Sequence, residues 1–335
     1  MAAAERLLCE RVARLLAARR VTLVERVQEL WGGYGELVRV DVERSDGDEQ
    51  PAVVKHVSPP RAPSSNTPEG RSHRRKLRSY EVEATFYRDF SSRCTEPCRV
   101  PRHLGAEARG ESRVLVLEDI DFAGFPRRKR RVGASEAEAC LRWLAAFHAT
   151  FLGVEPTGLW KQGTYWHLAT RPDELGALRF PELRRAASAI DERLRAAQFV
   201  TLVHGDAKLD NFCFSAVGSV AAVDFQYVGA GPGVKDVVYL LSSCFDGEEN
   251  VAFAPALLDF YFHELSRNLE DQLSAAARGA LEAEWRSLYA YAWADWERFL
   301  FGWAPHEPRD RYAAAHTERV LAELNSSLRK PSSGA

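Results

Sequence analysis

The chain has 335 residues, of which 46% are hydrophobic, and its 45 Lys and Arg against 47 Asp and Glu leave a net charge of −2 at pH 7. At roughly 150 residues per domain, this length suggests two domains or lobes. The balanced charge argues against a nucleic-acid partner bound through bulk charge. No apolar run reaches the roughly 20 residues that span a bilayer. The six cysteines lack the spacing of a metal site or a disulfide framework, so we expect free thiols and a cytoplasmic protein.

The first part of the chain has apolar side chains at helical spacing over residues 5–30, which predicts an N-terminal helix packed on the body of the protein. Its Arg-rich start leaves organelle targeting as an alternative. A Gly-rich corner follows at residues 32–35, and valines alternate with charged residues over 38–43. This alternation predicts a strand. A turn signal at 46–47 then leads into a second strand that starts at Ala52.

Further along, residues 58–72 are rich in Pro and Ser and predict an exposed loop. Residues 77–90 return to helical spacing, and residues 113–118 read as a short apolar strand. A connector near residues 118–124 leads to a chain that is mostly helical from residue 135 onward. Two short strands, TLVHGD and SVAAVDF, interrupt the helices.

Strands therefore come first and helices later, an order that predicts an α+β protein. We expect a small sheet-bearing lobe over residues 1–120 and a larger helical lobe over residues 121–327. The last residues, 328–335, read as a flexible tail.

Three polar side chains follow the two short strands. Asp206 and Asn211 come after the first strand, and Asp224 ends the second. If the two strands form one hairpin, these side chains meet at the same end of it. Their oxygens are hard donors suited to Mg²⁺, but they are too few to chelate it without substrate phosphates. The alternative for each residue taken alone is an ordinary turn residue.

The segments HGDAKLDN and AVDFQ resemble the catalytic core of small-molecule kinases of the protein-kinase-like fold. The group includes choline kinases, aminoglycoside phosphotransferases and ecdysteroid kinase-like proteins, and the resemblance covers about residues 29–305. It implies a two-lobed fold with a small antiparallel-sheet lobe and a mainly helical second lobe. It also implies transfer of a phosphoryl group from ATP, with Mg²⁺, to a hydroxyl of a small organic molecule.

By the same resemblance, Asp206 is the base that accepts the proton of the acceptor hydroxyl, and Asn211 and Asp224 hold Mg²⁺ at the ATP phosphates. His204 then braces the catalytic loop. Asp236 resembles the aspartate that anchors this loop, and an ordinary helix N-cap is the alternative.

The first lobe contains Lys55 within the apolar strand VVKHV, where a charge is costly unless it is paired. The resemblance implies that Lys55 grips the α- and β-phosphates of ATP and that Glu83 holds Lys55. Glu81 is the rival partner. A lysine that extends from an edge strand into solvent is the structural alternative.

Two further nucleotide contacts depend on the place of their segments in the chain. Backbone N–H groups of Gly33 and Gly35 can approach phosphates closely, although a glycine cluster is more often only a turn. The resemblance places the connector at the adenine ring, with backbone groups near Glu118 and Ile120 facing it.

The acceptor is the least defined part of the prediction. Aromatic residues of the helical lobe are expected mainly in the core, and some are expected to line an acceptor pocket: Trp160, Tyr165, Trp166, Trp285, Tyr289, Trp293, Trp296, Phe299 and Trp303. Aromatic walls suit a flat, sterol-like alcohol and equally an amino alcohol held by cation–π attraction. Asp295 and Glu297 either favour an amine or are solvated helix charges.

Two other functions compete with this one for the whole chain. A catalytically silent nucleotide-binding scaffold of the same fold is disfavoured by the intact set of polar residues. A protein kinase is disfavoured because only about ten residues separate Asp224 from the turn before Asp236. The basic run 127–131 is expected to be a solvated loop rather than a nuclear signal. His148 is expected to be a hydrogen-bonded core histidine.

Overall fold

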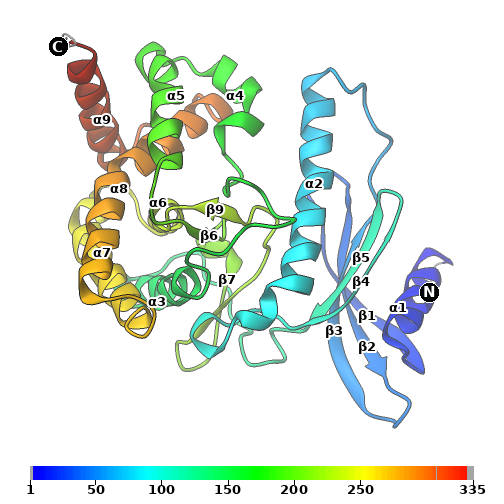
Figure 1. Ribbon diagram of the computed structural model, residues 1–335. Helices are drawn as coiled ribbons and strands as arrows, with labels where there is room; N and C mark the ends of the chain where they lie inside the picture. Colours follow the sequence, from blue (N-terminus) through cyan, green and yellow to red (C-terminus); the bar gives the residue numbers. More distant parts are fainter. Residues whose placement is uncertain (1–2, 307, 330–335) are drawn as a thin grey trace. The chain divides into compact units, whose positions relative to one another are not determined.

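The computed structural model describes residues 3–306 and 308–329 (Figure 1). This part of the chain forms two compact units. The first, here called the sheet unit, runs up to Arg128 and also includes Cys213–Gln226. The second, the helical unit, comprises Lys129–Phe212 and the chain from Tyr227 onward. The division into lobes at residue 120 stays a prediction, and most of the expected tail lies outside the described residues.

The sheet unit is built on a five-stranded antiparallel sheet with the order β1-β2-β3-β5-β4. Its strands are β1 (Arg20–Glu29), β2 (Gly35–Glu43), β3 (Glu49–Val57), β4 (His103–Arg109) and β5 (Ser112–Glu118). Helix α1 (Ala3–Leu16) packs on one face of the sheet. There Val12 joins a core cluster with Val38, Val54 and Val116, which lie opposite one another on β2, β3 and β5. Helix α2 (Pro68–Asp89) lies along the other face (Figure 1). The sheet therefore displays alternate side chains of each strand to α1 and to α2.

Two sequence-based predictions are wrong in this unit. The expected helix over 5–30 ends at Leu16, and Arg20–Glu29 forms β1, because its β-branched residues suit an edge position beside β2. The expected loop over 58–72 ends early, because α2 begins at Pro68. Thr67 caps this helix by accepting the N–H of Gly70, and proline suits the first turn of a helix.

Two short antiparallel strand pairs lie in the second half of the chain. Strand β6 (Thr201–Val203) pairs with β9 (Gly229–Gly231), and β7 (Phe212–Phe214) pairs with β8 (Val220–Ala222). The prediction that TLVHGD and SVAAVDF form one hairpin is therefore wrong. A short turn joins β7 directly to β8, and closing a short loop costs less entropy than closing a long one.

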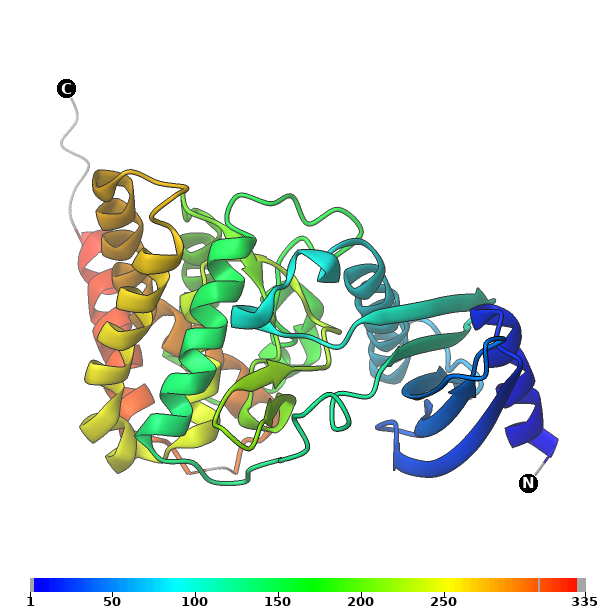
Figure 2. The ribbon, with the colours of Figure 1, turned by 90° about the horizontal axis from the view of Figure 1, so that it is seen from below.

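The helical unit otherwise consists of helices, as its sequence predicts. They are α3 (Ala134–Thr150), α4 (Pro172–Ala177), α5 (Pro181–Arg195), α6 (Val234–Cys244), α7 (Gly247–Asn268), α8 (Ala275–Trp303) and α9 (Arg311–Arg329). Four short 3₁₀ turns complete the described elements: Ser91–Arg93, Glu96–Cys98, Leu168–Thr170 and Leu209–Asn211. Helices α3 and α7 lie side by side, as do α8 and α9 (Figure 2). Within residues 3–306 and 308–329, none of the helices combines the length and apolar character that crossing a bilayer requires.

The predicted fold class is confirmed: an α+β protein with a small antiparallel-sheet part and a larger, mainly helical part.

Candidate active site

Lys55 lies on the face of the sheet that α2 covers, and its ammonium group contacts two carboxylates. Its Nζ is 2.7 Å from Glu83 Oε2, on α2, and 3.3 Å from Asp224 Oδ1, just after β8. Lys55 and Glu83 are both buried. A buried charge is costly unless it is paired and hydrogen-bonded, and here both conditions hold. The pairing excludes a lysine that simply extends into solvent.

The charges in this group depend on one another. Burial by itself would lower the pKa of Lys55, but attraction to Asp224 and Glu83 outweighs burial and raises it, so Lys55 is a cation at neutral pH. Burial raises the pKa of Glu83, and the attraction of Lys55 opposes that rise. The rival Glu81 contacts Arg78 and Arg113 instead of Lys55.

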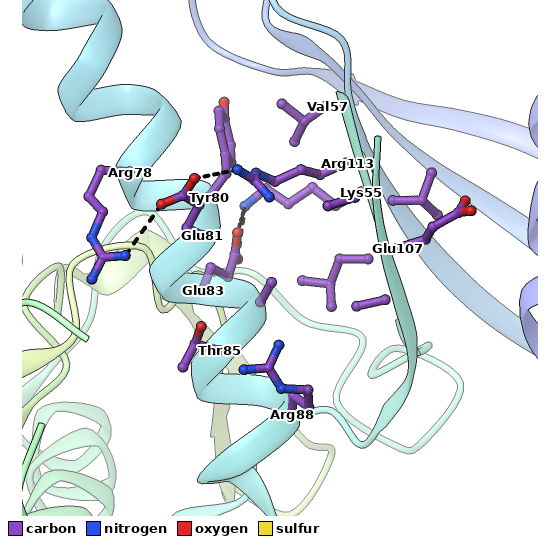
Figure 3. Close-up of a pocket in the computed structure, with 15 residues that line it drawn as sticks. Lys55, Val57, Arg78, Tyr80, Glu81, Glu83, Thr85, Arg88, Glu107 and Arg113 are labelled. Atoms are coloured by element: carbon purple, nitrogen blue, oxygen red, sulfur yellow. Dashed lines mark hydrogen bonds and ion pairs between the residues drawn. The ribbon is translucent and has the colours of Figure 1, made fainter. Parts of the chain in front are cut away.

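A cavity of about 300 Å³ lies beside this group, between α2 and strands β3, β4 and β5 (Figure 3). Lys55 and Glu83 belong to its wall, and the Glu81–Arg113 pair bridges the helix and the sheet. Small side chains leave this space open, among them Ala84 and Ala106. The Lys55–Glu83 pair thus borders a hollow within the sheet unit.

The Gly-rich corner between β1 and β2 is held by α2. Lys76 Nζ donates to the carbonyl oxygen of Trp31 over 2.6 Å and lies 4.1 Å from the centre of the Trp31 ring. The hydroxyl of Tyr34 is 2.6 Å from Nδ1 of His73. The N–H of Gly33 donates to Leu30 within the turn. The phosphate contacts expected of Gly33 and of its neighbour Gly35 stay predictions.

The connector after β5 is a polar junction. The Glu118 carboxylate accepts from Arg99 and from both the side chain and the backbone of Arg102. The N–H of Glu118 donates to the Arg102 carbonyl, and the carbonyl of Ile120 accepts from Phe125. These bonds fix the shape of the connector. The adenine contacts expected near Glu118 and Ile120 stay predictions.

In the helical unit, Asp206 and Asn211 lie together in the loop that follows β6. Asn211 Nδ2 donates to the backbone oxygen of Asp206 over 2.7 Å and to its Oδ2 over 3.0 Å. His204 Nδ1 accepts the N–H of Asp206 over 3.2 Å, so His204 braces the loop as expected. Gly205 has φ +79, and a Cβ there would lie 2.0 Å from the carbonyl oxygen of Tyr227. Only glycine fits this position of the H-G-D segment.

Asp236 anchors this loop. Its carboxylate accepts the N–H of His204 over 2.6 Å and the N–H of Gly205 over 2.9 Å, and it is fully buried. The alternative role as N-cap of α6 is excluded, because Gly233 occupies that position. His148 Nε2 is 3.1 Å from Asp236, and its Nδ1 is 2.8 Å from the Tyr261 hydroxyl. His148 is thus the hydrogen-bonded core histidine that the sequence predicts.

Aromatic side chains gather beside Asp206. The Tyr239 hydroxyl donates a hydrogen bond to the Tyr165 hydroxyl over 3.3 Å. Burial and the negative charge of Asp206 raise the pKa of Tyr239, which therefore keeps its proton. Trp296 and Phe299 of α8 pack on Tyr165, with ring centres 6.2 Å and 5.1 Å away. The sequence missed Tyr239, because a tyrosine on an apolar helix gives no sign of a functional role.

The remaining aromatic residues divide into core and surface. Trp285 and Trp293 are buried in the core, as expected, whereas Trp303 is exposed.

Asp295 and Glu297 are neither solvated nor available to an amine. Asp295 is buried and pairs with Lys235 and Arg298, and Glu297 pairs with Arg309.

The polar groups of each unit have the chemistry that Mg²⁺ prefers. Because Asn211 turns its NH₂ group towards Asp206, its side-chain oxygen is the atom suited to a cation. Asp224 receives Lys55 and Gln226 on Oδ1. A carboxylate offers about four lone-pair sites, so it can accept these contacts and also bind a cation. Each unit therefore offers oxygen atoms of the kind that a divalent metal with oxygen ligands prefers.

Solved structures with a similar fold include phosphotransferases. Choline kinase LicA from Streptococcus pneumoniae is 15% identical, with a TM-score of 0.46, and the match covers 97% of this chain and 100% of that one. Plasmodium vivax ethanolamine kinase is 12% identical, with a TM-score of 0.47 and coverage of 92% and 81%. Macrolide 2′-phosphotransferase MphH from Brachybacterium faecium is 16% identical, with a TM-score of 0.43 and coverage of 96% and 97%.

No curated protein matches the chain in sequence. A family model does match: the phosphotransferase enzyme family, over residues 39–275. That range is more than half of the chain, and it contains Lys55, the carboxylates and the loop after β6 described above. The chain belongs to the phosphotransferase enzyme family and is a small-molecule kinase.

Proposed function

We propose that the protein transfers the terminal phosphoryl group of ATP, with Mg²⁺, to a hydroxyl of a small organic molecule. The observation that carries this proposal is the position of the Lys55 ammonium between Glu83 and Asp224. This arrangement keeps a cation charged inside the sheet unit, where it can hold phosphate oxygens. Family membership supports the same reaction class.

In this proposal each polar residue has one task. Lys55 binds the α- and β-phosphates, and Glu83 keeps Lys55 in place. Asn211 and Asp224 are the residues that would hold Mg²⁺, which neutralises charge on the transferred group when bound. Asp206 orients the acceptor hydroxyl and accepts its proton.

Backbone groups complete the nucleotide site in this proposal. Those of Gly33 and Gly35 would contact phosphates, and those near Glu118 and Ile120 would contact adenine.

For the acceptor, we propose a neutral alcohol with a flat apolar body, such as a sterol-like molecule, ahead of an amino alcohol. The aromatic side chains beside Asp206 supply apolar walls. The two carboxylates of α8 that could favour an amine, Asp295 and Glu297, are already paired within the protein. In addition, the Arg171 guanidinium lies 5.4 Å from the centre of the Tyr165 ring and 5.0 Å from that of Phe299. A second cation on these rings would be repelled.

The first prediction concerns Asp206. Replacing Asp206 with Asn keeps its size but removes the base, so phosphoryl transfer should fall by about 10²- to 10⁴-fold. Nucleotide affinity should stay close to that of the wild type. Transfer from labelled ATP to a metabolite extract, with products separated by chromatography, measures the rate. Asp210→Asn is the matched control, because Asp210 is exposed in the same loop.

Equal transfer by the Asp206→Asn and wild-type proteins would remove Asp206 from its role. Binding of ATP without transfer to any extract would favour the silent scaffold instead.

The acceptor class needs its own experiment. Sterol-like alcohols and amino alcohols of similar size would be offered as separate panels with labelled ATP. Phosphorylation confined to the amino alcohols would overturn the preference for a neutral acceptor, while the kinase assignment would stand.

A further inference from the structure

Gln226 links Asp224 to α2 by a route that does not involve Lys55. Its Nε2 donates to Asp224 Oδ1 over 2.6 Å, and its Oε1 lies 2.9 Å from the hydroxyl oxygen of Ser79. Ser79 is fully buried on α2. All three residues belong to the sheet unit. The metal ligand of the proposed function is thus tied to a helix through one side-chain amide.

The orientation of this amide follows from its neighbours. A carboxylate only accepts hydrogen bonds, so the NH₂ group of Gln226 must face Asp224. The amide oxygen then faces the Ser79 hydroxyl, which is its donor. That hydroxyl also lies 2.8 Å from the carbonyl oxygen of Lys76. Ser79 therefore shares one proton between its own helix and Gln226.

Two chains of hydrogen bonds connect α2 to the same oxygen atom, Asp224 Oδ1. Ser79 reaches Asp224 Oδ1 through Gln226, and Glu83 reaches it through Lys55. Ser79 and Glu83 are four residues apart, so they lie on one face of the helix. Both routes end on Oδ1, and a rotation of the Asp224 side chain would stretch both. Together they define the direction in which this carboxylate points.

The backbone of Asp224 makes such support necessary. Its φ is +69, in the left-handed region that costs a residue with a Cβ atom. Strained conformations of this kind persist when surrounding contacts determine them. Gln226 lies only two residues after Asp224, so its side chain can reach the carboxylate that it supports. The contact therefore depends on this chain's own residue at that position.

We propose that Gln226 is a positioning residue that orients Asp224 for metal binding and that Ser79 fixes the Gln226 amide. The proposal deepens the proposed function and rests on it. Gln226 itself touches neither the metal nor the substrate in this view. It acts by holding one carboxylate oxygen, so its loss should weaken metal binding more than nucleotide binding.

Mn²⁺ binding in the presence of a non-hydrolysable ATP analogue tests the proposal, with free Mn²⁺ followed by electron paramagnetic resonance. Gln226→Leu should weaken Mn²⁺ binding by about 10-fold or more, as is usual when a group that orients a metal ligand is lost. Ser79→Ala should weaken it by about five-fold, the worth of one neutral hydrogen bond. Affinity for the analogue without metal should change little. Gln50→Leu is the matched control, because Gln50 accepts from Arg44 on an exposed part of the sheet unit.

A second measurement needs neither metal nor nucleotide. In ¹⁵N-labelled protein, the side-chain amide signal of Gln226 is identified by its absence in Gln226→Leu. Ser79→Ala should speed the exchange of these amide protons with solvent, whereas Gln50→Leu should leave it unchanged.

The outcomes separate the two levels of the proposal. If the wild-type protein binds no Mn²⁺ with the nucleotide analogue, the proposed function fails. If the wild-type protein binds Mn²⁺ and Gln226→Leu binds it equally well, the positioning role fails and the proposed function stands. Unchanged amide exchange in Ser79→Ala would remove Ser79 from the arrangement.

Discussion

A single buried lysine, Lys55, pairs with carboxylates from two other segments of the sheet unit. Lys55 lies in an apolar strand, and the cost of burying its charge already predicts from the sequence that it has a partner. The sequence left Glu81 and Glu83 as competing candidates. The structure decides for Glu83, because Glu81 contacts arginines instead. The two glutamates are only two residues apart, so helical spacing alone points them to different sides of α2.

Glu83→Gln should weaken nucleotide binding. The substitution removes the negative charge that holds Lys55 and leaves Asp224 as its carboxylate partner. A hydrogen bond to a charged group contributes enough that nucleotide affinity should fall by about 10- to 100-fold. Titration calorimetry with an ATP analogue measures the change.

The control for this prediction is Glu81→Gln, which removes the rival carboxylate. Its nucleotide affinity should remain near that of the wild type. An equal loss in both variants would show that the charge of α2, rather than the Lys55–Glu83 pair, matters for binding.

Other residues of the site gave no usable signal in the sequence. Gln226 follows Asp-Phe, and only its distance to Ser79 in the folded chain reveals a contact. Lys76 is one of several basic residues in its segment, and its contact with Trp31 joins elements far apart in the sequence. Such contacts depend on packing between elements, which local patterns do not encode.

Among the elements, α6 shows how one glycine fixes a helix against its neighbours. A Cβ at Gly233 would lie 2.5 Å from the Trp285 ring, 2.6 Å from the Tyr261 hydroxyl and 2.7 Å from His148 Nδ1. This close approach lets α6 start at the position from which Asp236 accepts the N–H groups of His204 and Gly205. The Gly-Pro-Gly sequence predicts a turn, but the three neighbours come from other elements.

Gly233→Ala should destabilise the helical unit by about 1–3 kcal/mol, the usual cost of overpacking a filled core. Gly279→Ala is the matched control, because Gly279 is exposed in α8 and a Cβ there meets nothing within 4 Å. That variant should be more stable than the wild type by up to about 1 kcal/mol. Urea unfolding followed by tryptophan fluorescence compares the two. Equal stability of both variants would contradict the tight fit at Gly233.

Elements with strong local signals were predicted well, and elements with weak signals were not. The hairpin of β2 and β3 was predicted from its alternating pattern and its Asp46-Gly47 turn. Strand β1 was mistaken for helix, since its apolar spacing fits both structures. Strand pairing was wrong for β6 and β8, because three-residue strands carry too little pattern to specify a partner.

In the whole molecule, seven of the eight tryptophans belong to the helical unit, so their fluorescence reports the unfolding of that unit.

A buried histidine of the helical unit makes the stability of this unit depend on pH. Burial lowers the pKa of His167 to about 4, and repulsion from Lys235 and Arg298 adds to the effect while Asp295 opposes it. Between pH 4 and about 6.5, the unfolded chain binds a proton on His167 that the folded chain does not.

The helical unit should therefore lose stability as the pH falls below about 6.5. For His167 alone, the loss between pH 7 and pH 5 should be about 2 kcal/mol. His167→Gln should lack this part of the pH dependence, whereas His263→Gln, at an exposed position, should retain it. Urea unfolding at each pH provides the free energies. Identical pH profiles for His167→Gln and the wild type would contradict the role of His167.

The α+β class could be predicted from local signals in the sequence, namely periodicity and turn residues, and motif spacing was enough to name Lys55 and Asp224 as candidate site residues. The sequence also determined that Lys55 needs a carboxylate partner, because burying an unpaired charge is unfavourable wherever it occurs. The choice of Glu83 as the partner of Lys55, and the pairing of the short strands, could be read only from the folded chain. The folded chain also decided that Asp295 and Glu297 are internal ion-pair partners. These outcomes follow from distances between segments far apart in the chain, and such distances are set by the packing of all elements together.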